Sequence, residues 1–375
     1  MSVTTPPPKR RWRPLVWLFV FVQGVVLPLA LVGGLAAYLH PQTFWWAQLV
    51  AIGLPYWTAL LVLFTLTLLL AKQRGWALAY AVISLWLLAR TLPLGWLASP
   101  PDPAPDDLVL LTFNTPISGA IPEVLLDGTR TFFEDTAPTI AGLQEVVTVQ
   151  GRERRWLPNH IALVADSLDY LVPMPPLGTE RTVDARVPLL IHPAASEVGF
   201  ETLSQSAFEL FPDEEMTSEV FRTHFRWQGR EGVHYNVHLV SFGIAKPWTD
   251  GVPFYSLSGA LGYLRQYRDA YRRRAAHVEA IRAMLAQETL PVLISGDFNA
   301  TPYNWSVRQL SQGRTDAFRT TGRGWGATYR ADLPVVRIDF VFADPAWEVV
   351  RAEVPSLFLS DHKPLLVRLR WAEPE

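Results

Sequence analysis

Polar side chains that suit metal binding and proton transfer follow short apolar segments throughout the second part of this 375-residue chain. These residues are Asn114, Glu145, His238, Asp297, Asn299, Asp339, Asp361 and His362. Carboxylate and amide oxygens are the ligands that a hard cation such as Mg²⁺ or Mn²⁺ prefers. A carboxylate paired with a histidine suits proton transfer and charge stabilisation during a displacement. The set therefore predicts a site that combines a divalent cation with acid–base groups.

Each of these residues also has an ordinary structural interpretation. Asp and Asn after a strand are most often turn or cap residues, and Glu145 alone could cap a helix. His238 alone is more often an ordinary strand histidine than a catalyst. The ordered set is more specific than any single member.

In their order along the chain, these segments resemble the endonuclease/exonuclease/phosphatase (DNase-I-like) superfamily. The blocks that carry the resemblance include Leu110–Asn114, Leu143–Glu145, Ser295–Asn299, Arg337–Phe340 and Ser360–His362. The resemblance covers about residues 106–372. It implies an α/β fold, namely a four-layer α/β/β/α sandwich with the site at one end of two packed sheets. It also implies a metal-dependent phosphoric ester hydrolase, with a phosphodiesterase or nuclease-like activity ranked first.

The resemblance also implies a metal set. Glu145 would be the principal Mg²⁺ ligand, with Mn²⁺ as the other candidate ion, and Asn114 and Asp361 would lie in or next to the metal shell. The acidic residue that some nuclease members carry two positions after the first Asn is absent, because Thr115 is followed by Pro116. This departure puts a second carboxylate ligand from that segment in doubt.

For the catalytic groups, the resemblance implies that Asp297 orients or deprotonates the attacking water and that Asn299 holds the phosphoryl oxygen or that water. His362, oriented by Asp339, would bind the phosphoryl group. His238 would stabilise the pentacovalent state or assist the leaving group. The sequence does not separate Asp297 from Asp361 as the general base, and we take Asp297.

The physical logic of phosphoester cleavage agrees with these roles. Negative charge develops on the equatorial and leaving oxygens, so a cation and imidazolium donors stabilise the transition state while a carboxylate handles the proton of water. Rival chemistries lack their motifs, because the chain has no Gly-x-Ser-x-Gly elbow and no P-loop Gly-Lys-Ser/Thr. The chain also has no cysteine, which excludes disulfides, thiolate metal sites and cysteine nucleophiles.

The elements that must position these groups are short strands and at least one long helix. Helical spacing of apolar residues over 261–285 predicts a helix. Apolar, β-rich runs predict strands at 108–113, 187–191, 220–227, 233–239, 292–295, 338–342 and 365–369. Strands with interspersed helices indicate an α/β or α+β domain of two or more layers.

The front of the chain has a different composition from this domain. Residues 1–99 hold seven Lys or Arg and no acidic residue, whereas the remainder carries 26 basic and 35 acidic residues. Apolar stretches at 14–39, 46–71 and 76–98 each exceed the roughly 20 residues that cross a bilayer. We therefore expect a membrane anchor of three transmembrane helices in residues 1–98, a Pro-rich linker at 99–105 and a catalytic domain at 106–372.

Basic residues also predict the orientation of this anchor. Lys9–Arg13 precede the first stretch and Lys72 and Arg74 lie between the second and third, so the positive-inside rule puts these segments in the cytoplasm. Three crossings then leave the catalytic domain outside the cytoplasm, on a multi-pass protein of the cell (inner or plasma) membrane. Two alternatives stay open. The first stretch could be a cleaved signal peptide, and the third, interrupted by Arg90, could lie along the interface and return the domain to the cytoplasm.

The substrate is predicted less sharply than the reaction. An acidic domain is poorly matched to a long polyanion, so lipid headgroups or small phosphodiesters rank above nucleic acid, and the lipid bilayer is the expected partner. No protein partner is inferable. Arginines 265, 268, 272, 273 and 274 form either a solvated helix face or a contact for phosphates or anionic headgroups. The aromatic residues Phe242, Trp248, Phe254 and Tyr255 form a substrate-covering loop, a contact with the bilayer interface or local core. A non-catalytic membrane receptor or scaffold that binds phosphorylated ligands is the alternative function.

Overall fold

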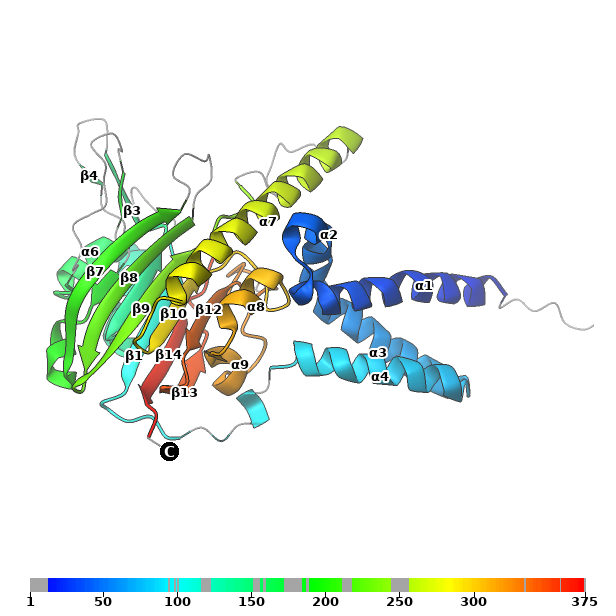
Figure 1. The fold of residues 1–375 in the computed structure, drawn as a ribbon, viewed down its shortest axis with the longest axis horizontal. Coiled ribbons are helices and arrows are strands. Elements are labelled where there is room, and N and C mark those ends of the chain that lie inside the picture. The colour runs from blue at the N-terminus through cyan, green and yellow to red at the C-terminus, as the bar shows by residue number, and fades with distance from the viewer. Residues whose placement is uncertain are drawn as a thin grey trace, which may run out of the picture.

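The structure is a computed structural model of the whole chain. It describes residues 13–93, 95–97, 99, 101–115, 123–150, 156–157, 160–171, 184–186, 189–210, 218–243, 256–333, 335–357 and 359–373. Four helices come first, and a two-sheet domain follows them (Figure 1).

The N-terminal helices are α1 (Arg13–Leu35), α2 (Pro41–Ile52), α3 (Leu54–Leu70) and α4 (Arg74–Thr91). The start of α1 and the α3–α4 connection lie at the end of this group that points away from the sheets (Figure 1). Among the described residues, one helix, Trp17–Tyr38, is long and apolar enough by itself to cross a membrane. The α2–α3 pair would add a second if the two helices form one bent span.

The boundaries of the second and third apolar stretches differ from the sequence prediction. The stretch at 46–71 is not one helix, because the chain bends by 62° between α2 and α3. Gly53 ends α2 and Pro55 lies in the first turn of α3, a combination that stops one helix and starts another. The third helix ends at Thr91 instead of residue 98, so Arg90 lies in its last turn. There a cation interacts favourably with the helix dipole.

Helix α2 packs directly on the two-sheet domain, against α7 (Leu257–Leu285) and close to the start of α8 (Trp305–Ser311). The fully buried Gln48 is the centre of this contact. Its Oε1 accepts from the backbone N–H of Trp305 at 2.9 Å, and its carbonyl accepts from Asn304 Nδ2 at 2.9 Å. Its own Nε2 donates to the carbonyls of Ala36 and Leu39, both at 2.8 Å. The side-chain oxygen and the backbone carbonyl of Gln48 therefore tie the N-terminal helices to the domain, while its Nε2 orients the side chain within those helices.

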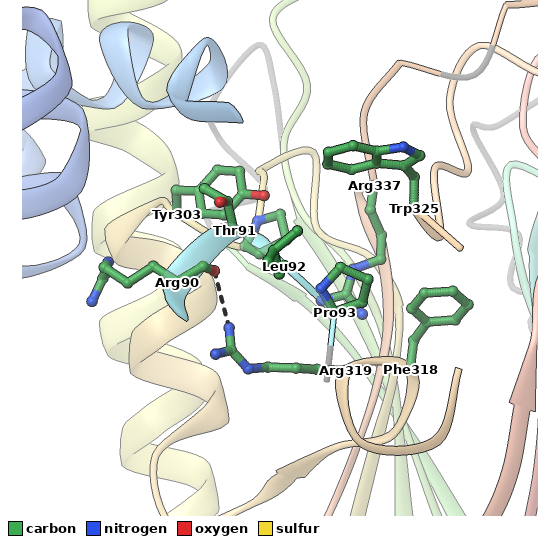
Figure 2. Close-up of a pocket in the computed structure, with 10 residues that line it drawn as sticks. Arg90, Thr91, Leu92, Pro93, Tyr303, Phe318, Arg319, Trp325 and Arg337 are labelled. Carbon is green, nitrogen blue, oxygen red and sulfur yellow. Dashed lines mark hydrogen bonds between the residues drawn. The ribbon is translucent and has the colours of Figure 1, made fainter. Parts of the chain in front are cut away.

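A second contact joins the domain to the end of α4. Arg319 of α9 (Ala317–Thr321) donates to the carbonyls of Ala89 and Arg90, at 2.8 and 3.1 Å (Figure 2). These are carbonyls that the helix end leaves without an intrahelical partner. The small cavity beside this contact is lined by Tyr303, Trp325 and neighbouring residues.

The domain contains two main sheets. The five-stranded sheet has the order β13-β14-β1-β2-β6, and the six-stranded sheet has the order β11-β12-β10-β9-β8-β7. The first is built from β1 (Leu108–Asn114), β2 (Ile140–Gln144), β6 (Leu189–Ile191), β13 (Trp347–Glu353) and β14 (Leu365–Trp371). The second is built from β7 (Phe200–Leu210), β8 (Ser218–Trp227), β9 (Arg230–His238), β10 (Val292–Asp297), β11 (Thr315–Asp316) and β12 (Asp339–Ala343). A small third sheet consists of β3 (Val147–Gln150), β4 (Trp156–Leu157) and β5 (Asp184–Arg186).

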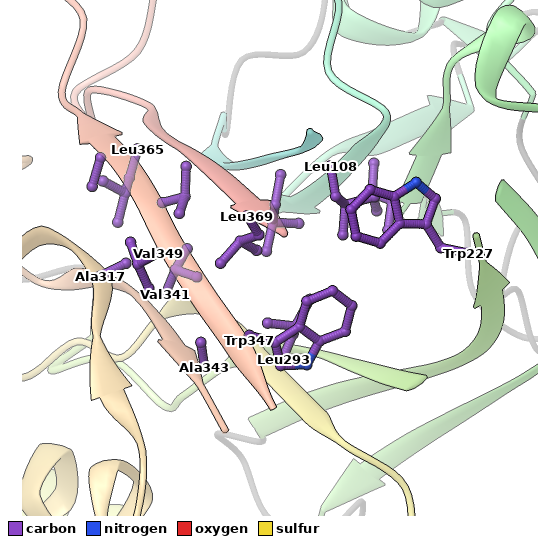
Figure 3. Close-up of a cluster of buried hydrophobic side chains, with 14 of the residues drawn as sticks. Leu108, Trp227, Leu293, Ala317, Val341, Ala343, Trp347, Val349, Leu365 and Leu369 are labelled. Atoms are coloured by element: carbon purple, nitrogen blue, oxygen red, sulfur yellow. The ribbon is translucent and has the colours of Figure 1, made fainter. Parts of the chain in front are cut away.

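The inner faces of the two main sheets share one hydrophobic core (Figure 3). Leu108 comes from one sheet and Leu293 from the other, and Trp227 stacks on Trp347 with ring centroids 6.0 Å apart. The outer face of the six-stranded sheet is covered by α7 and α8. The outer face of the five-stranded sheet is covered by α5 (Glu123–Thr136) and α6 (His160–Ser167). This is the four-layer α/β/β/α arrangement, and the predicted fold class is confirmed.

Candidate active site

The site residues lie where parallel strands of both sheets end. Strands β1 and β2 run parallel, with Asn114 opposite Gln144, and β9 and β10 run parallel, with His238 opposite Asp297. Gly296 allows the second pair to come this close, because its φ is 140° and a Cβ there would lie 1.8 Å from the carbonyl oxygen of Val237. Side chains from both sheets therefore converge at one edge.

The amide of Asn114 joins the two sheets at this edge. Its Nδ2 donates to Oε1 of Glu145 at 3.2 Å and to Oδ2 of Asp297 at 2.9 Å. Its Oδ1 is buried and has no hydrogen-bond partner. A buried amide oxygen beside a carboxylate is a donor set that suits Mg²⁺ or Mn²⁺. Asn114 and Glu145 therefore fit the cation that the sequence predicts.

Glu145 is held in an unusual backbone conformation, with φ at 57°, directly after β2. Its Oε1 lies 3.4 Å from Nε2 of His238. Burial alone would raise the pKa of Glu145, but the hydrogen bond and charge of His238, the amide of Asn114 and the charge of His362 lower that pKa to about 2. Glu145 is thus a carboxylate at neutral pH, which is the form that binds a cation.

His362 lies between two buried carboxylates. Its Nδ1 is 3.0 Å from Oδ2 of Asp339, and its Nε2 is 3.8 Å from Oδ2 of Asp297. Burial opposes the charged ring, but the two carboxylates outweigh it and raise the pKa of His362 to about 9. One ligand atom from each of these three residues lies within 4.8 Å of the others, a geometry that could itself hold a metal ion. We assign the cation to the Glu145 side on geometry, because the partnerless Oδ1 of Asn114 belongs to the amide whose Nδ2 contacts Glu145.

Asp297, like Asp339, is a fully buried carboxylate of the site. Oδ1 of Asp297 accepts from the backbone N–H of Asn299 at 2.7 Å. Burial raises the pKa of Asp297, while the charges of His362 and His238 oppose this rise. The Nδ2 of Asn299 donates to the carbonyl of Leu239 at 2.8 Å and to Oδ2 of Asp297 at 3.2 Å. Asn299 therefore orients Asp297 and the segment after His238.

Asp361 lies at the exposed margin of the group. The hydroxyl of Ser360 donates to the carbonyl of Asn114 at 2.8 Å, and the same oxygen lies 3.3 Å from Oδ1 of Asp361. The charge of Asp361 also acts on His362. The structure thus brings Asn114, Glu145, His238, Asp297, Asn299, Asp339 and His362 together. Asp361 is the one predicted site residue that lies at the margin of this group instead of within it.

A buried arginine that fixes the backbone just after His238 was not predicted from the sequence. The guanidinium of Arg274 is fully buried, and its Nε and Nη2 donate to the carbonyl of Val240 at 3.0 and 2.8 Å. The N–H of Val240 donates to Oγ of Ser218 at 2.8 Å, and that oxygen lies 2.6 Å from Nδ1 of His277. Both backbone polar groups of Val240 are therefore fixed from α7 and β8. The only sequence signal was that Arg274 is the last of three consecutive arginines, which does not distinguish a buried arginine from its neighbours.

The aromatic segment after His238 is only partly described. Phe242 packs against Tyr267 and Tyr271 at centroid distances of 4.2 and 5.1 Å, so it forms local core. Trp248, Phe254 and Tyr255 lie outside the described residues.

The sequence profile of the Endonuclease/Exonuclease/phosphatase family matches residues 122–362. The chain belongs to this family. Its members are hydrolases that act on phosphoesters. No curated protein sequence matches the chain.

Several solved structures are similar to this family member. One is an endonuclease/exonuclease/phosphatase from Bacteroides vulgatus, with 19% identity, a TM-score of 0.47 and coverage of 71% of this chain and 99% of that one. A second is a mannosyl-6-phosphatase from Bacteroides thetaiotaomicron, with 15% identity, a TM-score of 0.47 and coverage of 70% and 100%. A third is the human Nocturnin catalytic domain, with 14% identity, a TM-score of 0.47 and coverage of 75% and 100%.

Proposed function

We propose that this protein is a membrane-anchored, divalent-metal-dependent phosphodiesterase whose catalytic domain faces away from the cytoplasm. The observation that carries the proposal is the convergence of two imidazoles and three carboxylates around Asn114, whose amide contacts both Glu145 and Asp297. This set contains what phosphoester hydrolysis needs: a cation ligand, a proton acceptor and two cationic donors.

Glu145 and Asn114 would hold Mg²⁺ or Mn²⁺, with Asp361 next to the shell through Ser360. A bound divalent cation supplies electrostatic stabilisation of the phosphoryl oxygens. The low pKa of Glu145 keeps this carboxylate ionised for that role over the neutral range.

The chain's own residues would carry out the displacement. Asp297 accepts a proton from the attacking water while the water oxygen forms a bond to phosphorus, and Asn299 keeps the Asp297 carboxylate in position. His362, held by Asp339, donates a charged hydrogen bond to a phosphoryl oxygen. The bond from phosphorus to the leaving oxygen breaks, and His238 provides the donor for that oxygen. No residue becomes covalently modified.

We further propose that α1, α3 and α4 cross the bilayer and that α2 lies at its outer surface. At 1.5 Å per residue, α3 and α4 each reach about 26 Å, close to the roughly 30 Å hydrocarbon core. Large apolar side chains on these helices are exposed, including Phe21, Leu70 and Leu78. Lys72 and Arg74 lie in the connection that points away from the catalytic domain, where the positive-inside rule expects the cytoplasm.

This arrangement favours substrates at or near the membrane. Because Gln48 and Arg319 dock the domain on α2 and α4, the site would stay close to the lipid surface. The excess of acidic residues after residue 99 disfavours a long polyanion such as DNA. Lipid headgroups or small phosphodiesters are therefore the proposed substrates.

The experiment is hydrolysis by the full-length chain in detergent of bis(p-nitrophenyl) phosphate, sphingomyelin, phosphatidylinositol phosphates and plasmid DNA, each with Mg²⁺, Mn²⁺ or EDTA. His362→Ala should abolish the metal-dependent activity. The matched control is His224→Ala, because His224 of β8 pairs with Glu231 of β9, away from the site. Folded protein that cleaves nothing on this panel would favour a receptor that binds phosphorylated ligands.

The topology has a separate test. An alkaline phosphatase reporter fused after residue 100 should be active, because that reporter folds only outside the cytoplasm. An inactive reporter would reverse the proposed orientation without affecting the hydrolase assignment.

A further inference from the structure

We propose that the first turns of α7 insert into the outer headgroup region of the bilayer and form a second, non-spanning membrane contact of the catalytic domain. This inference rests on the membrane anchoring proposed above. The occupant of this helix face is a lipid surface that carries anionic headgroups.

The start of α7 exposes an apolar stripe. Leu257, Leu261 and Leu264 are 78%, 43% and 41% exposed. Their spacing of four and three residues places them on one face of the helix. The part of α7 that covers the sheet buries Ala275, Val278 and Ile281 instead. The leucines thus extend beyond the sheet that the rest of the helix covers.

Arginines continue the same stripe along the helix. At about 100° per residue, Arg265, Arg268 and Arg272 lie within about 80° of Leu257 around the helix axis. The leucines come first and the arginines follow, so a helix that enters a membrane with its N-terminal end would bury the leucines and leave the exposed Arg265 at the level of the phosphates. Arg268 pairs with Asp269, and Arg272 donates to the carbonyl of Gln42. Leucine burial and arginine–phosphate contact are the two interactions that hold amphipathic helices at an interface.

Contacts with α2 fix where this stripe lies relative to the proposed membrane helices. The Nε2 of Gln42 donates to the carbonyl of Arg272 at 3.1 Å, and Nε of Arg272 donates to the carbonyl of Gln42 at 3.1 Å. His40 Nε2 lies 3.0 Å from Oε1 of Glu279. From Arg272 back to Leu257 the helix extends about 22 Å, toward the side of the molecule on which α1, α3 and α4 lie (Figure 1). The start of α7 therefore lies on the same side of the catalytic domain as α2, the helix proposed to lie at the outer surface of the bilayer.

The contact would also set the height of the site above the lipid. The same helix carries Arg274, which holds the carbonyl of Val240 two residues after His238. A membrane contact at the start of α7 and the docking of α2 would fix the domain at two points, so its active site would keep one orientation toward the surface.

Single-cysteine spin labelling tests this proposal, because the chain contains no cysteine. Nitroxides are attached to Leu261→Cys, to Leu66→Cys on the exposed face of α3 and to Glu348→Cys on β13, in full-length protein in vesicles of phosphatidylcholine with phosphatidylglycerol. Collisions with oxygen and with a water-soluble nickel chelate report whether each label lies in lipid or in water. We expect labels 261 and 66 in lipid and label 348 in water, with all three proteins retaining diester hydrolysis.

The possible outcomes distinguish failure of the α7 contact from failure of the membrane anchor and from failure of the hydrolase assignment. Label 66 in lipid with label 261 in water would overturn the α7 contact while leaving the anchor in place. Both labels in water would overturn the anchor and the contact together. Loss of hydrolysis in every variant and in wild type would count against the enzyme alone.

A second variant, Leu257→Ser with Leu261→Ser and Leu264→Ser, should lower hydrolysis of vesicle lipid severalfold and leave bis(p-nitrophenyl) phosphate hydrolysis unchanged. An equal effect on both substrates would contradict a role in membrane contact.

Discussion

The Nε2 atom of His238 lies 3.4 Å from Oε1 of Glu145, although the two residues follow strands of different sheets. Asn114 and Asp297 form a second contact between the sheets, at 2.9 Å. Neither sheet holds a complete set of catalytic groups. The site therefore exists only when the two sheets are packed through their shared core, so stability of the sandwich and activity should be closely linked.

The two carboxylates beside His362, Asp297 and Asp339, predict a bell-shaped dependence of the hydrolysis rate on pH. The rate should rise as Asp297, whose pKa burial raises, loses its proton, and it should fall as His362 loses its proton near pH 9. The stability that the charged ring contributes is present below its unfolded pKa and is lost as the pH rises through about 9. Rates and thermal unfolding measured across pH would check both expectations.

Asp339→Asn tests the cause of the fall in rate at alkaline pH, the alkaline limb of the profile. Asp339 is the largest influence that raises the pKa of His362, so its loss should move the limb to lower pH and reduce kcat by about 10²- to 10⁴-fold. Asp166→Asn, at an exposed position of α6, is the matched control and should leave the profile unchanged. An unmoved alkaline limb in Asp339→Asn would assign that limb to another group.

Glu145→Gln should weaken binding of the divalent cation. The amide keeps the size of the side chain but removes its charge, so the Mg²⁺ concentration for half-maximal rate should rise by at least about tenfold. Glu123→Gln, exposed in the first turn of α5, is the control. Calorimetric titration with Mn²⁺ gives an activity-independent measure, and equal affinity in both variants would remove Glu145 from the metal shell.

Arg274→Met should destabilise the domain and slow catalysis. The substitution leaves the buried carbonyl of Val240 without its donors, which costs about 1–3 kcal/mol. Because Val240 follows His238 closely, kcat should fall more than KM changes. Arg282→Met, exposed on the same helix, is the control. A stability loss without any change in kcat would restrict Arg274 to a structural role.

Gln48→Leu should uncouple the N-terminal helices from the catalytic domain. The change removes the side-chain bonds to Trp305, Ala36 and Leu39 in a buried contact. At about 0.5–1.5 kcal/mol for each bond, the full-length protein should unfold at a lower temperature in detergent and be cleaved faster by protease near residue 100. Gln312→Leu, at an exposed position, is the control, and equal behaviour of the two variants would contradict the docking role.

Seven of the fourteen described strands could be predicted from sequence, together with the site residues that lie at strand ends. The runs at 108–113 and 292–295 form strands, because continuous apolar composition suits sheets covered on both faces. The run at 220–227 forms a strand whose apolar residues alternate with polar ones. The long helix begins four residues before the predicted start, since Ser256 caps it by accepting from the N–H of Gly259. Strand β7 was missed because its sequence lacks a continuous apolar run.

The remaining features depend on contacts between distant segments. Nothing local distinguishes the buried Arg274 from its exposed neighbours, since burial depends on how α7 crosses the chain after β9. In the sequence, Gln48 is a single polar residue within an apolar stretch. Its role in docking the N-terminal helices on the domain depends on the position of α8. The division of residues 46–71 into two helices did have a local signal, because Gly53 and Pro55 flank the bend.

Metal-dependent hydrolysis at this site is tested most directly by following bis(p-nitrophenyl) phosphate hydrolysis in one purified sample of full-length protein, before EDTA, after EDTA and after Mg²⁺ is restored. We expect loss and recovery of the rate in wild type, and a rate that stays at background throughout in Asp297→Asn protein with an unchanged unfolding temperature. A rate that persists in EDTA, or that Asp297→Asn leaves intact, would contradict a metal-dependent hydrolase at this site.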